Sequence, residues 1–322
     1  MTHPTQLRNL TNTVAALATF TASSLSVFAA PANYQSKAVK PVTAPLESNW
    51  LDKTITPVTN PLYFEDPRIT SEIRPIFANH WFPNSYHNRT TAAPLALGGS
   101  AQVYAVQARY ALTDRLALIA TKDGYYELQP NNTVSHRGGW ANLAAGFKYA
   151  LIDDRVNQLI VTPGLTFEIP TGNRDVFQGT GSGEWNPFVS AAKGFGDFHI
   201  TANVGGRIPN DFSKQTAQLH YSLQFDYYTC QYFIPFVALN GQTVLSSGDQ
   251  KLLGAVDMNT EMSDIINFGA TKAKNVTQIT VGAGFRSKLA KNVDVGVSYE
   301  IPATRPVGLF ESRLTADVIW RF

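Results

Sequence analysis

Apolar residues alternate with small or polar residues over most of the chain that follows residue 71. The pattern is clearest at Leu143, Ala145, Phe147, Tyr149 and Leu151, whose intervening neighbours are small or polar. The same pattern recurs at 159–169, 198–207, 218–227, 278–286 and 293–301. A period of two is the period of a β-strand. Runs of about 9–11 residues have the length of a tilted strand that crosses a membrane.

The composition of the two strand faces distinguishes a membrane barrel from a soluble one. The second face carries Gly, Thr, Ser, Asn, Gln and isolated charges of both signs, whereas a soluble barrel has an apolar inside and a charged outside. The apolar face carries aromatic residues near strand ends, at Tyr110, Tyr149, Phe167, Tyr227, Tyr299 and Trp320. Lipid outside, a polar lumen and aromatic girdles explain these features. We therefore predict an all-β, antiparallel, up-and-down transmembrane β-barrel, a closed sheet that leaves no backbone donor unpaired in hydrocarbon.

The connections between the predicted strands alternate between short and long. Short ones fall near 112–114, 152–155, 196–197, 228–229 and 291–292, and long ones near 124–138, 170–184, 208–214, 241–275 and 302–310. Short turns are expected on the periplasmic side and long loops on the outer side. An even strand count requires one more strand at the start, for which Ile73 to Phe82 is the candidate. We predict twelve strands, with ten and fourteen as alternatives; segments 185–195 and 230–240 have mixed parity.

The N-terminus has the pattern of a secretory signal peptide. Arg8 lies in a polar lead, apolar stretches follow at 14–20 and 25–30, and Val27 and Ala29 occupy the small-residue positions before a cleavage site. We predict a signal peptide over residues 1–29, cut after Ala29; the alternative is an ordinary apolar helix. No later window approaches the roughly 20 apolar residues of a membrane helix.

Residues 30–70 form a Pro-rich leader, and the barrel is assigned to 71–322. Residues 41–45 and 57–61 share a P-V-T-x-P pattern. Because Pro fixes φ and lacks an amide donor, the leader is predicted to be extended. The following stretch, Tyr63 to Arg68, mixes aromatic and charged side chains. It is predicted either to dock inside or under the barrel as a plug, or to remain a solvated periplasmic tether.

The last residues alternate up to the carboxy-terminus. Leu314, Ala316, Val318, Trp320 and Phe322 are apolar, and Phe322 is terminal. This ending resembles the last strand of bacterial outer-membrane barrels, which the barrel-assembly machinery recognises. The resemblance implies that Trp320 and Phe322 form an assembly signal.

One hairpin carries a resemblance to a known family. Residues 109–118, Arg-Tyr-Ala-Leu-Thr-Asp-Arg-Leu-Ala-Leu, are similar to a hairpin of the outer-membrane transporter family "MetA-pathway of phenol degradation", although that family usually has Gly where this chain has Ala111. Pro170-Thr-Gly172, before a long loop, is also similar. The resemblance covers residues 100–322. It implies an outer-membrane channel for small compounds, including hydrophobic or aromatic ones.

Composition and charge exclude several other classes of protein. Charged residues make up 16% of the chain, against about 25% in ordinary soluble domains. Mean hydropathy is −0.12, so there is no apolar excess for membrane helices. A net charge of +2 does not favour a nucleic-acid partner. The single cysteine, Cys230, permits no internal disulfide and no Cys-based zinc site, and no cofactor is expected.

Candidate catalytic or metal-binding residues are few. No histidine pair has the spacing of a zinc-binding helix, and no Ser/His/Asp arrangement is legible, so no enzyme is predicted. His199 and His220 are expected on the lumen face of adjacent strands, where they could meet. Hydrogen-bonded lumen residues are the plainer interpretation of this pair.

Charged residues on the inward face are the main site candidates. We expect Arg109, Arg115, Lys148, Arg207, Arg286 and Arg313 to face Glu168, Asp226, Asp294, Glu300 and Asp317 inside the lumen. Charges in a barrel of this size must be paired or hydrated. They could form an electrostatic constriction that selects solutes, or structural ion pairs that plug the lumen.

The longest predicted loop, 241–275, is too apolar for a freely solvated segment. It contains Leu252, Met258, Met262 and Phe268. We expect it to fold into or across the mouth as a gate; the alternative is a compact surface cap.

These features together predict an outer-membrane, porin-like channel for passive passage of small solutes. Its expected partners are outer-membrane lipid, the barrel-assembly machinery and the solutes, and a homo-oligomer is left open. The alternative is a closed barrel that serves as a structural or surface-interaction module. An enzyme at the barrel rim is a third interpretation.

Overall fold

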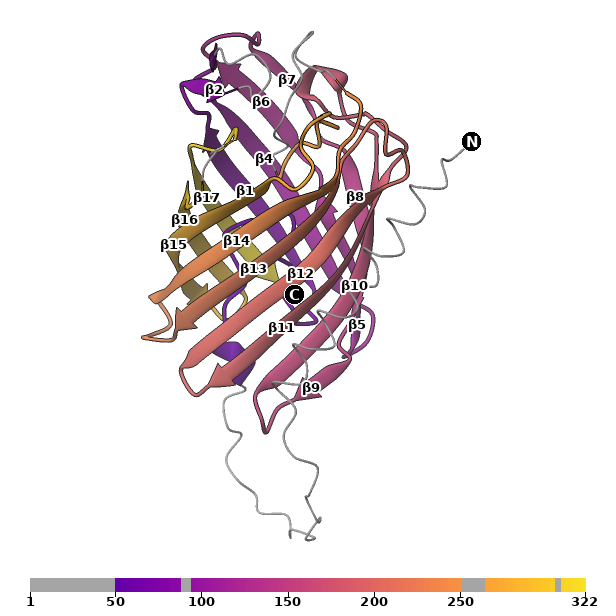
Figure 1. Cartoon of the computed structure of the whole chain (residues 1–322). Helices are drawn as coiled ribbons and strands as arrows, with labels where there is room; N and C mark the ends of the chain where they lie inside the picture. The colour runs from indigo at the N-terminus through magenta and orange to yellow at the C-terminus, as the bar shows by residue number, and fades with distance from the viewer. Residues whose placement is uncertain (1–49, 88–93, 251–263, 305–307) are drawn as a thin grey trace, which may run out of the picture. The chain divides into compact units, whose positions relative to one another are not determined.

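The fold is a closed antiparallel barrel of twelve strand positions (Figure 1). The computed structural model describes residues 50–87, 94–250, 264–304 and 308–322. Strand β1 (Glu72–Trp81) pairs with β4 (Gly99–Ala111) on one side and with the last strand, β17 (Ser312–Arg321), on the other. This double pairing closes the ring. It confirms the predicted closed barrel of twelve strands and the first strand predicted at Ile73 to Phe82.

Two of the twelve positions are each built from two consecutive strands. The first combines β5 (Leu116–Lys122) and β6 (Tyr125–Pro130), and the next combines β7 (Arg137–Trp140) and β8 (Leu143–Tyr149). The remaining positions follow in chain order: β10 (Leu159–Ile169), β11 (Glu184–Phe195), β12 (Phe198–Pro209), β13 (Ala217–Tyr227), β14 (Ile234–Ser246), β15 (Thr277–Ala290) and β16 (Val293–Pro302).

Short accessory elements complete the described structure. Strands β2 (Ser85–His87) and β3 (Pro94–Ala96) form a separate hairpin, and β9 (Ile152–Asp154) pairs with β10. Two 3-10 helices are present, η1 (Trp50–Asp52) and η2 (Arg174–Val176). In the described part of the chain, no helix is long and apolar enough to cross a membrane.

Three predicted connections differ from the structure. The prediction of a long loop over 124–138 is wrong, because β6 and β7 continue the sheet and only residues 131–136 connect them. Pairing of Tyr125–Leu128 with Arg137–Trp140 supplies the backbone hydrogen bonds of both strands, and the turn-forming residues lie between them. Strand β14 begins at Ile234 and runs to Ser246, so the turn after β13 is longer, and the following loop shorter, than predicted.

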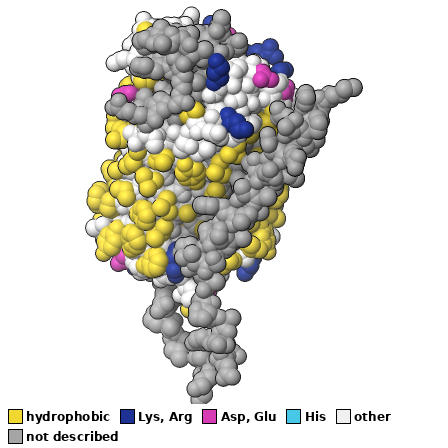
Figure 2. Space-filling view, viewed as in Figure 1, with side chains coloured by type: hydrophobic (Ala, Val, Ile, Leu, Met, Phe, Trp, Pro, Cys, Tyr) yellow, Lys and Arg dark blue, Asp and Glu magenta, His cyan; other side chains and the backbone are white. Residues whose placement is uncertain are grey.

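The outer surface of the wall is apolar, as the alternation predicts. In β8, Leu143, Phe147 and Tyr149 are exposed while Lys148 is fully buried. Figure 2 shows apolar side chains over the middle of the barrel, with charged side chains towards its two ends. Exposed aromatic residues lie at both ends of the wall: Tyr110, Phe195, Tyr227 and Trp320 near the short turns, and Trp81, Trp140, Trp185 and Tyr299 near the long loops. A band of this kind is suited to hydrocarbon between two interfaces.

Apolar packing inside the barrel is concentrated in separate clusters. One contains Trp50, Leu51 and Ile160, near the short turns. Another contains Tyr126, Leu128, Ile265, Phe268 and Leu309, near the long loops. Most buried side chains on the inward strand faces between them are polar or charged. The interior is therefore a polar chamber with apolar packing towards both ends.

Candidate functional site

The chain that precedes the first wall strand occupies the lumen. Residues 50–70, which we call the inner segment, are largely buried and contact inward side chains from most of the barrel wall. Near its middle the segment reverses direction: Asn60 adopts a left-handed φ of 45°, and its carbonyl accepts hydrogen bonds from the amides of Tyr63 and Phe64. Asn tolerates this conformation better than most residues. Tyr63 therefore lies at the tip of the segment.

The barrel wall holds the inner segment largely through the segment's own backbone. Pro-rich, extended chain leaves many of its carbonyl groups without a backbone partner, and inward side chains of the wall supply donors to several of them. These contacts are Arg286 to Thr56 (3.1 Å), Arg74 to Pro57 (2.7 Å), Gln107 to Pro61 (2.7 Å), Ser190 to Glu65 (2.8 Å), Lys148 to Asp66 (2.6 Å) and Thr162 to Pro67 (2.6 Å). The segment is thus bound by hydrogen bonds spread along its length.

Glu65 is the main charged contact between the inner segment and the wall. One carboxylate oxygen lies 2.7 Å from the ammonium of Lys148, and the other lies 2.6 Å from the guanidinium of Arg109. Asp66 pairs within the segment with Arg68 at 2.5 Å. These residues belong to the stretch from Tyr63 to Arg68, which lies inside the barrel wall. Residues 30–49 of the predicted leader lie outside the described residues.

The tip of the segment is packed between two wall residues. The ring of Tyr63 lies 4.7 Å from the ring of His220, and the guanidinium of Arg207 lies 5.0 Å from the Tyr63 ring centre. Arg207 in turn pairs with Glu184 at 2.6 Å. The Tyr63 ring thus makes a tilted aromatic contact with an imidazole and a cation–π contact with a guanidinium.

Most of the charged residues predicted to face the lumen do so. Arg286 pairs with Asp317 at 2.8 Å, Arg313 with Glu300 at 3.0 Å and Glu168 with Lys122 at 2.6 Å. Asp294 pairs with Arg321 at 2.8 Å, near the short turns. All these groups except Arg321 are buried, and each has a partner of opposite charge.

The two lumen histidines are hydrogen-bonded separately, which is the plainer of the two interpretations. His199 and His220 do not meet: His199 bonds to Asp226 at 2.8 Å and His220 to Asn186 at 2.8 Å, because strand register places Asp226 opposite His199 and Gly205 opposite His220. The inward position expected for Arg115 is wrong: Arg115 is exposed in the turn between β4 and β5, since the inward parity of β4 does not continue through the turn.

Sequence reasoning missed several charged residues that the structure brings into the site. Arg74 bonds to Asp317 at 2.5 Å and Glu72 lies 3.5 Å from Arg109. Lys122 and Glu184 pair with predicted residues. Glu72 and Arg74 share one parity in β1, and this alternation could have indicated that both face inward. Lys122 and Glu184 stand at strand ends, where parity is hard to assign.

The described residues that end the apolar loop, 264–275, pack at the barrel mouth. Of its predicted gate residues, Leu252, Met258 and Met262 lie outside the described residues, whereas Phe268 is buried and its ring centre lies 5.3 Å from that of Phe177. The carbonyl of Ile265 accepts a hydrogen bond from Gln178 (3.1 Å). Burial would raise the pKa of Asp264, but its contact with Arg313 at 2.5 Å holds that pKa below its usual range.

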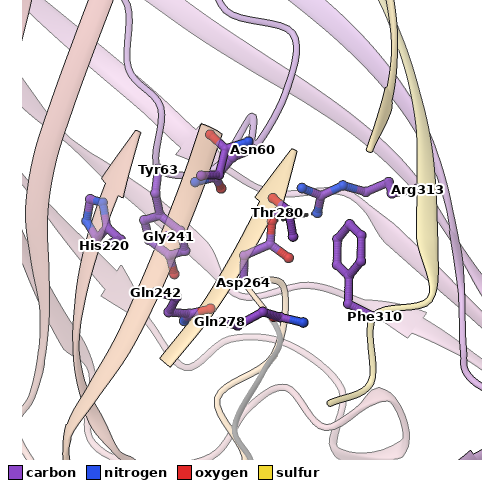
Figure 3. Close-up of a pocket in the computed structure, with 11 residues that line it drawn as sticks. Asn60, Tyr63, His220, Gly241, Gln242, Asp264, Gln278, Thr280, Phe310 and Arg313 are labelled. Atoms are coloured by element: carbon purple, nitrogen blue, oxygen red, sulfur yellow. Dashed lines mark hydrogen bonds and ion pairs between the residues drawn. The ribbon is translucent and has the colours of Figure 1, made fainter. Parts of the chain in front are cut away.

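The inner segment and the loop residues leave unequal spaces at the two ends. Near the short turns, a cavity of about 840 Å³ is lined by residues that include Asp52, Arg68, Lys288 and Arg321. Near the long loops, a cavity of about 30 Å³ lies beside Tyr63 and Asp264 (Figure 3). The described lumen is therefore wide at one end and nearly filled at the tip of the inner segment.

The predicted assembly signal lies at the open end of the wall near the short turns. Trp320 and Phe322 are exposed, with ring centres 6.1 Å apart. Their outward position places both rings among the aromatic residues of that end.

Comparisons with known proteins give structural matches. No family model matches the chain, and no curated protein matches it. The COG4313 outer membrane channel from Pseudomonas putida F1 is similar in structure, with a TM-score of 0.55, 14% identity, and coverage of 80% of this chain and 98% of that one. The NanC porin matches with a TM-score of 0.46, 9% identity, and coverage of 78% and 98%. The first match shows that the chain has the fold of an outer-membrane barrel.

Proposed function

We propose that this protein is an outer-membrane channel for the passive passage of small solutes. The observation that carries the proposal is the polar, charged lumen inside an apolar wall. Burying ion pairs is costly, and packed apolar residues of similar volume are often as stable or more stable. A lumen that retains so many paired charges and polar groups is better suited to water and solutes than to a purely structural core.

In this proposal the described conformation is the closed state. The inner segment is held by hydrogen bonds and ion pairs, whose partners can be replaced by water when the segment shifts. The loop that contains Asp264 and Phe268 closes the other side. The cargo that the family resemblance implies, hydrophobic or aromatic compounds, stays a prediction.

Single-channel recording of the purified full chain in planar bilayers tests the proposal. Stepwise currents are expected, with long closures caused by the filled lumen. Deleting residues 245–272 should raise the conductance, and unchanged conductance would remove the gate role of that loop. Silence of the intact chain and of the deletion variant together would contradict the channel.

The filled lumen also favours a second candidate, a closed barrel with a structural or surface-interaction role. This candidate predicts silence in the same recordings, with the barrel fold retained. The two proposals are therefore separated by one measurement.

A further inference from the structure

The cavity at the tip of the inner segment has the lining of a binding site. We call it the tip cavity; Asn60 and Tyr63 of the inner segment, Asn240 of β14, Thr280 of β15, Asp264 and Arg313 line it, among others. Figure 3 shows Asn60, Thr280 and Asp264 gathered between Tyr63 and Arg313. Its volume of about 30 Å³ gives room for one or two water-sized particles. Only a very small solute fits without movement of the lining.

Several buried oxygen atoms in the lining have no hydrogen-bond partner. Oδ1 of Asn60, Oδ1 of Asn240, Oδ1 of Asp264 and the hydroxyl of Tyr63 are buried without a partner. The Asn240 amide is oriented, since its Nδ2 donates to Glu300 at 3.0 Å and leaves Oδ1 free. Asn60, Tyr63 and Asn240 are each more than nine-tenths buried. Buried acceptors of this kind require a ligand or ordered water.

The charges around the tip cavity do not balance. Arg313 is the one cation in its described lining, and it pairs with two carboxylates, Asp264 at 2.5 Å and Glu300 at 3.0 Å. Arg207, on the far side of Tyr63, is already matched by Glu184. With both carboxylates ionised, these described groups sum to a local charge of minus one. A buried site with this charge favours a cation over a neutral or anionic occupant.

We propose that the tip cavity binds one small monovalent cation, of the size of ammonium or potassium, and makes the channel prefer cations. Oxygen atoms of carboxylate, amide and hydroxyl groups can replace the hydration shell of such an ion, as rings of oxygen ligands do in ion filters. The preference for cations during passage rests on the proposed channel function. Binding of the ion at the closed tip does not.

Ion-specific stabilisation tests the binding without requiring transport. Thermal unfolding of the detergent-solubilised full chain is compared in ammonium chloride, potassium chloride and N-methylglucamine chloride at equal ionic strength. The small cations should raise Tm by about 2 °C or more over N-methylglucamine, and the difference between ammonium and potassium identifies the better ligand. Equal Tm in all three salts would overturn the proposal, with water only in the cavity.

Matched variants assign the effect to the tip cavity. D264N removes one negative charge while Arg313 keeps Glu300. N240L removes the Oδ1 acceptor, together with the Nδ2 donor to Glu300, and changes no formal charge. Both should abolish or reduce the Tm difference. D175N removes an exposed carboxylate near Arg137, outside the cavity, and should leave the difference intact. A difference that survives D264N and N240L would also overturn the site.

Reversal potentials in a potassium chloride gradient test the preference during passage. The cation-to-anion permeability ratio of the full chain should exceed one and fall by a factor of roughly three or more in D264N, but not in D175N. An unchanged ratio in D264N would refute the selectivity role. A silent barrel that still shows ion-specific stabilisation would contradict the channel function and leave the cation site standing.

Discussion

Glu65 shows how one side chain ties the inner segment to the wall. Its carboxylate contacts Arg109 on β4 and Lys148 on β8, which are not adjacent in the barrel. All three groups are buried, so each depends on the others for compensation of its charge. Removing the carboxylate takes from Lys148 its ion pair and leaves Arg109 only the longer contact of 3.5 Å with Glu72. The contact is therefore more costly to break than an exposed pair of the same geometry.

We expect Glu65→Ala to lower the free energy of unfolding by about 3–5 kcal/mol, the usual cost of leaving a buried charge unpaired. The same variant should open more often in bilayers, because the inner segment loses its main charged contact. Denaturant unfolding in detergent measures the first effect.

The matched control for Glu65→Ala is Lys53→Ala, which removes a partner from the exposed pair with Asp197. Screening by solvent should keep that loss below about 1 kcal/mol. Equal losses in the two variants would contradict the role assigned to Glu65.

Parity along the strands identifies inward residues but not their partners. Alternation alone places Arg109, Lys148, Arg207, Arg286 and Arg313 inside the barrel, and the structure agrees. Their partners include Glu65 and Asp264, which lie outside the wall strands, where no periodicity fixes the direction of a side chain. Arg115 fails for the same reason, because it lies in a turn.

The inner segment as an element depends on the reversal at Asn60. The left-handed backbone of Asn60 lets the chain enter the lumen, reverse direction and return to the start of β1, with about ten residues before and after the reversal. A residue with a Cβ other than Asn or Asp pays about 1–2 kcal/mol in this conformation, whereas Gly does not.

Substitution at Asn60 separates this backbone effect from loss of the side chain. Amide hydrogen exchange at Tyr63 and Phe64, whose amides bond to the Asn60 carbonyl, should be faster in N60A than in N60G by roughly fivefold or more. Equal exchange in the two variants would show that the left-handed turn does not hold the tip.

Among the elements, wall strands were predictable because each has one face towards lipid and one towards polar groups. The period of two survives wherever both faces are present, as in β8 and β13. The prediction failed between Gly124 and Arg137, where the short strands β6 and β7 extend the wall on both sides of a turn-forming stretch. Pairing between neighbouring strands, which a single sequence does not display, decides the structure there.

In the whole molecule, the carboxy-terminal strand closes the barrel and carries the predicted assembly signal. Strand β17 pairs with β1 and β16, so it completes the ring. If Trp320 and Phe322 act as an assembly signal, deletion of Phe322 should lower the amount of folded barrel in outer-membrane fractions several-fold.

Because the Phe322 ring is exposed and contributes little to the core, refolding of the same variant into detergent should be nearly unchanged. A matched Tyr232→Ala variant, which removes an exposed aromatic side chain from a turn, controls for loss of an interface ring. A deletion variant that assembles normally would contradict the signal.

In the whole molecule, we propose that residues 50–70 close a polar channel inside a membrane-embedded barrel. The most direct test is the single-channel conductance of the full chain compared with a chain lacking residues 31–70, with barrel closure of both verified by heat-modifiable migration on gels. We expect larger and more frequent current steps after the deletion. Glu65→Ala, a milder variant that keeps the segment, should open more often than the full chain. A closed barrel whose conductance is the same in all three proteins would contradict it.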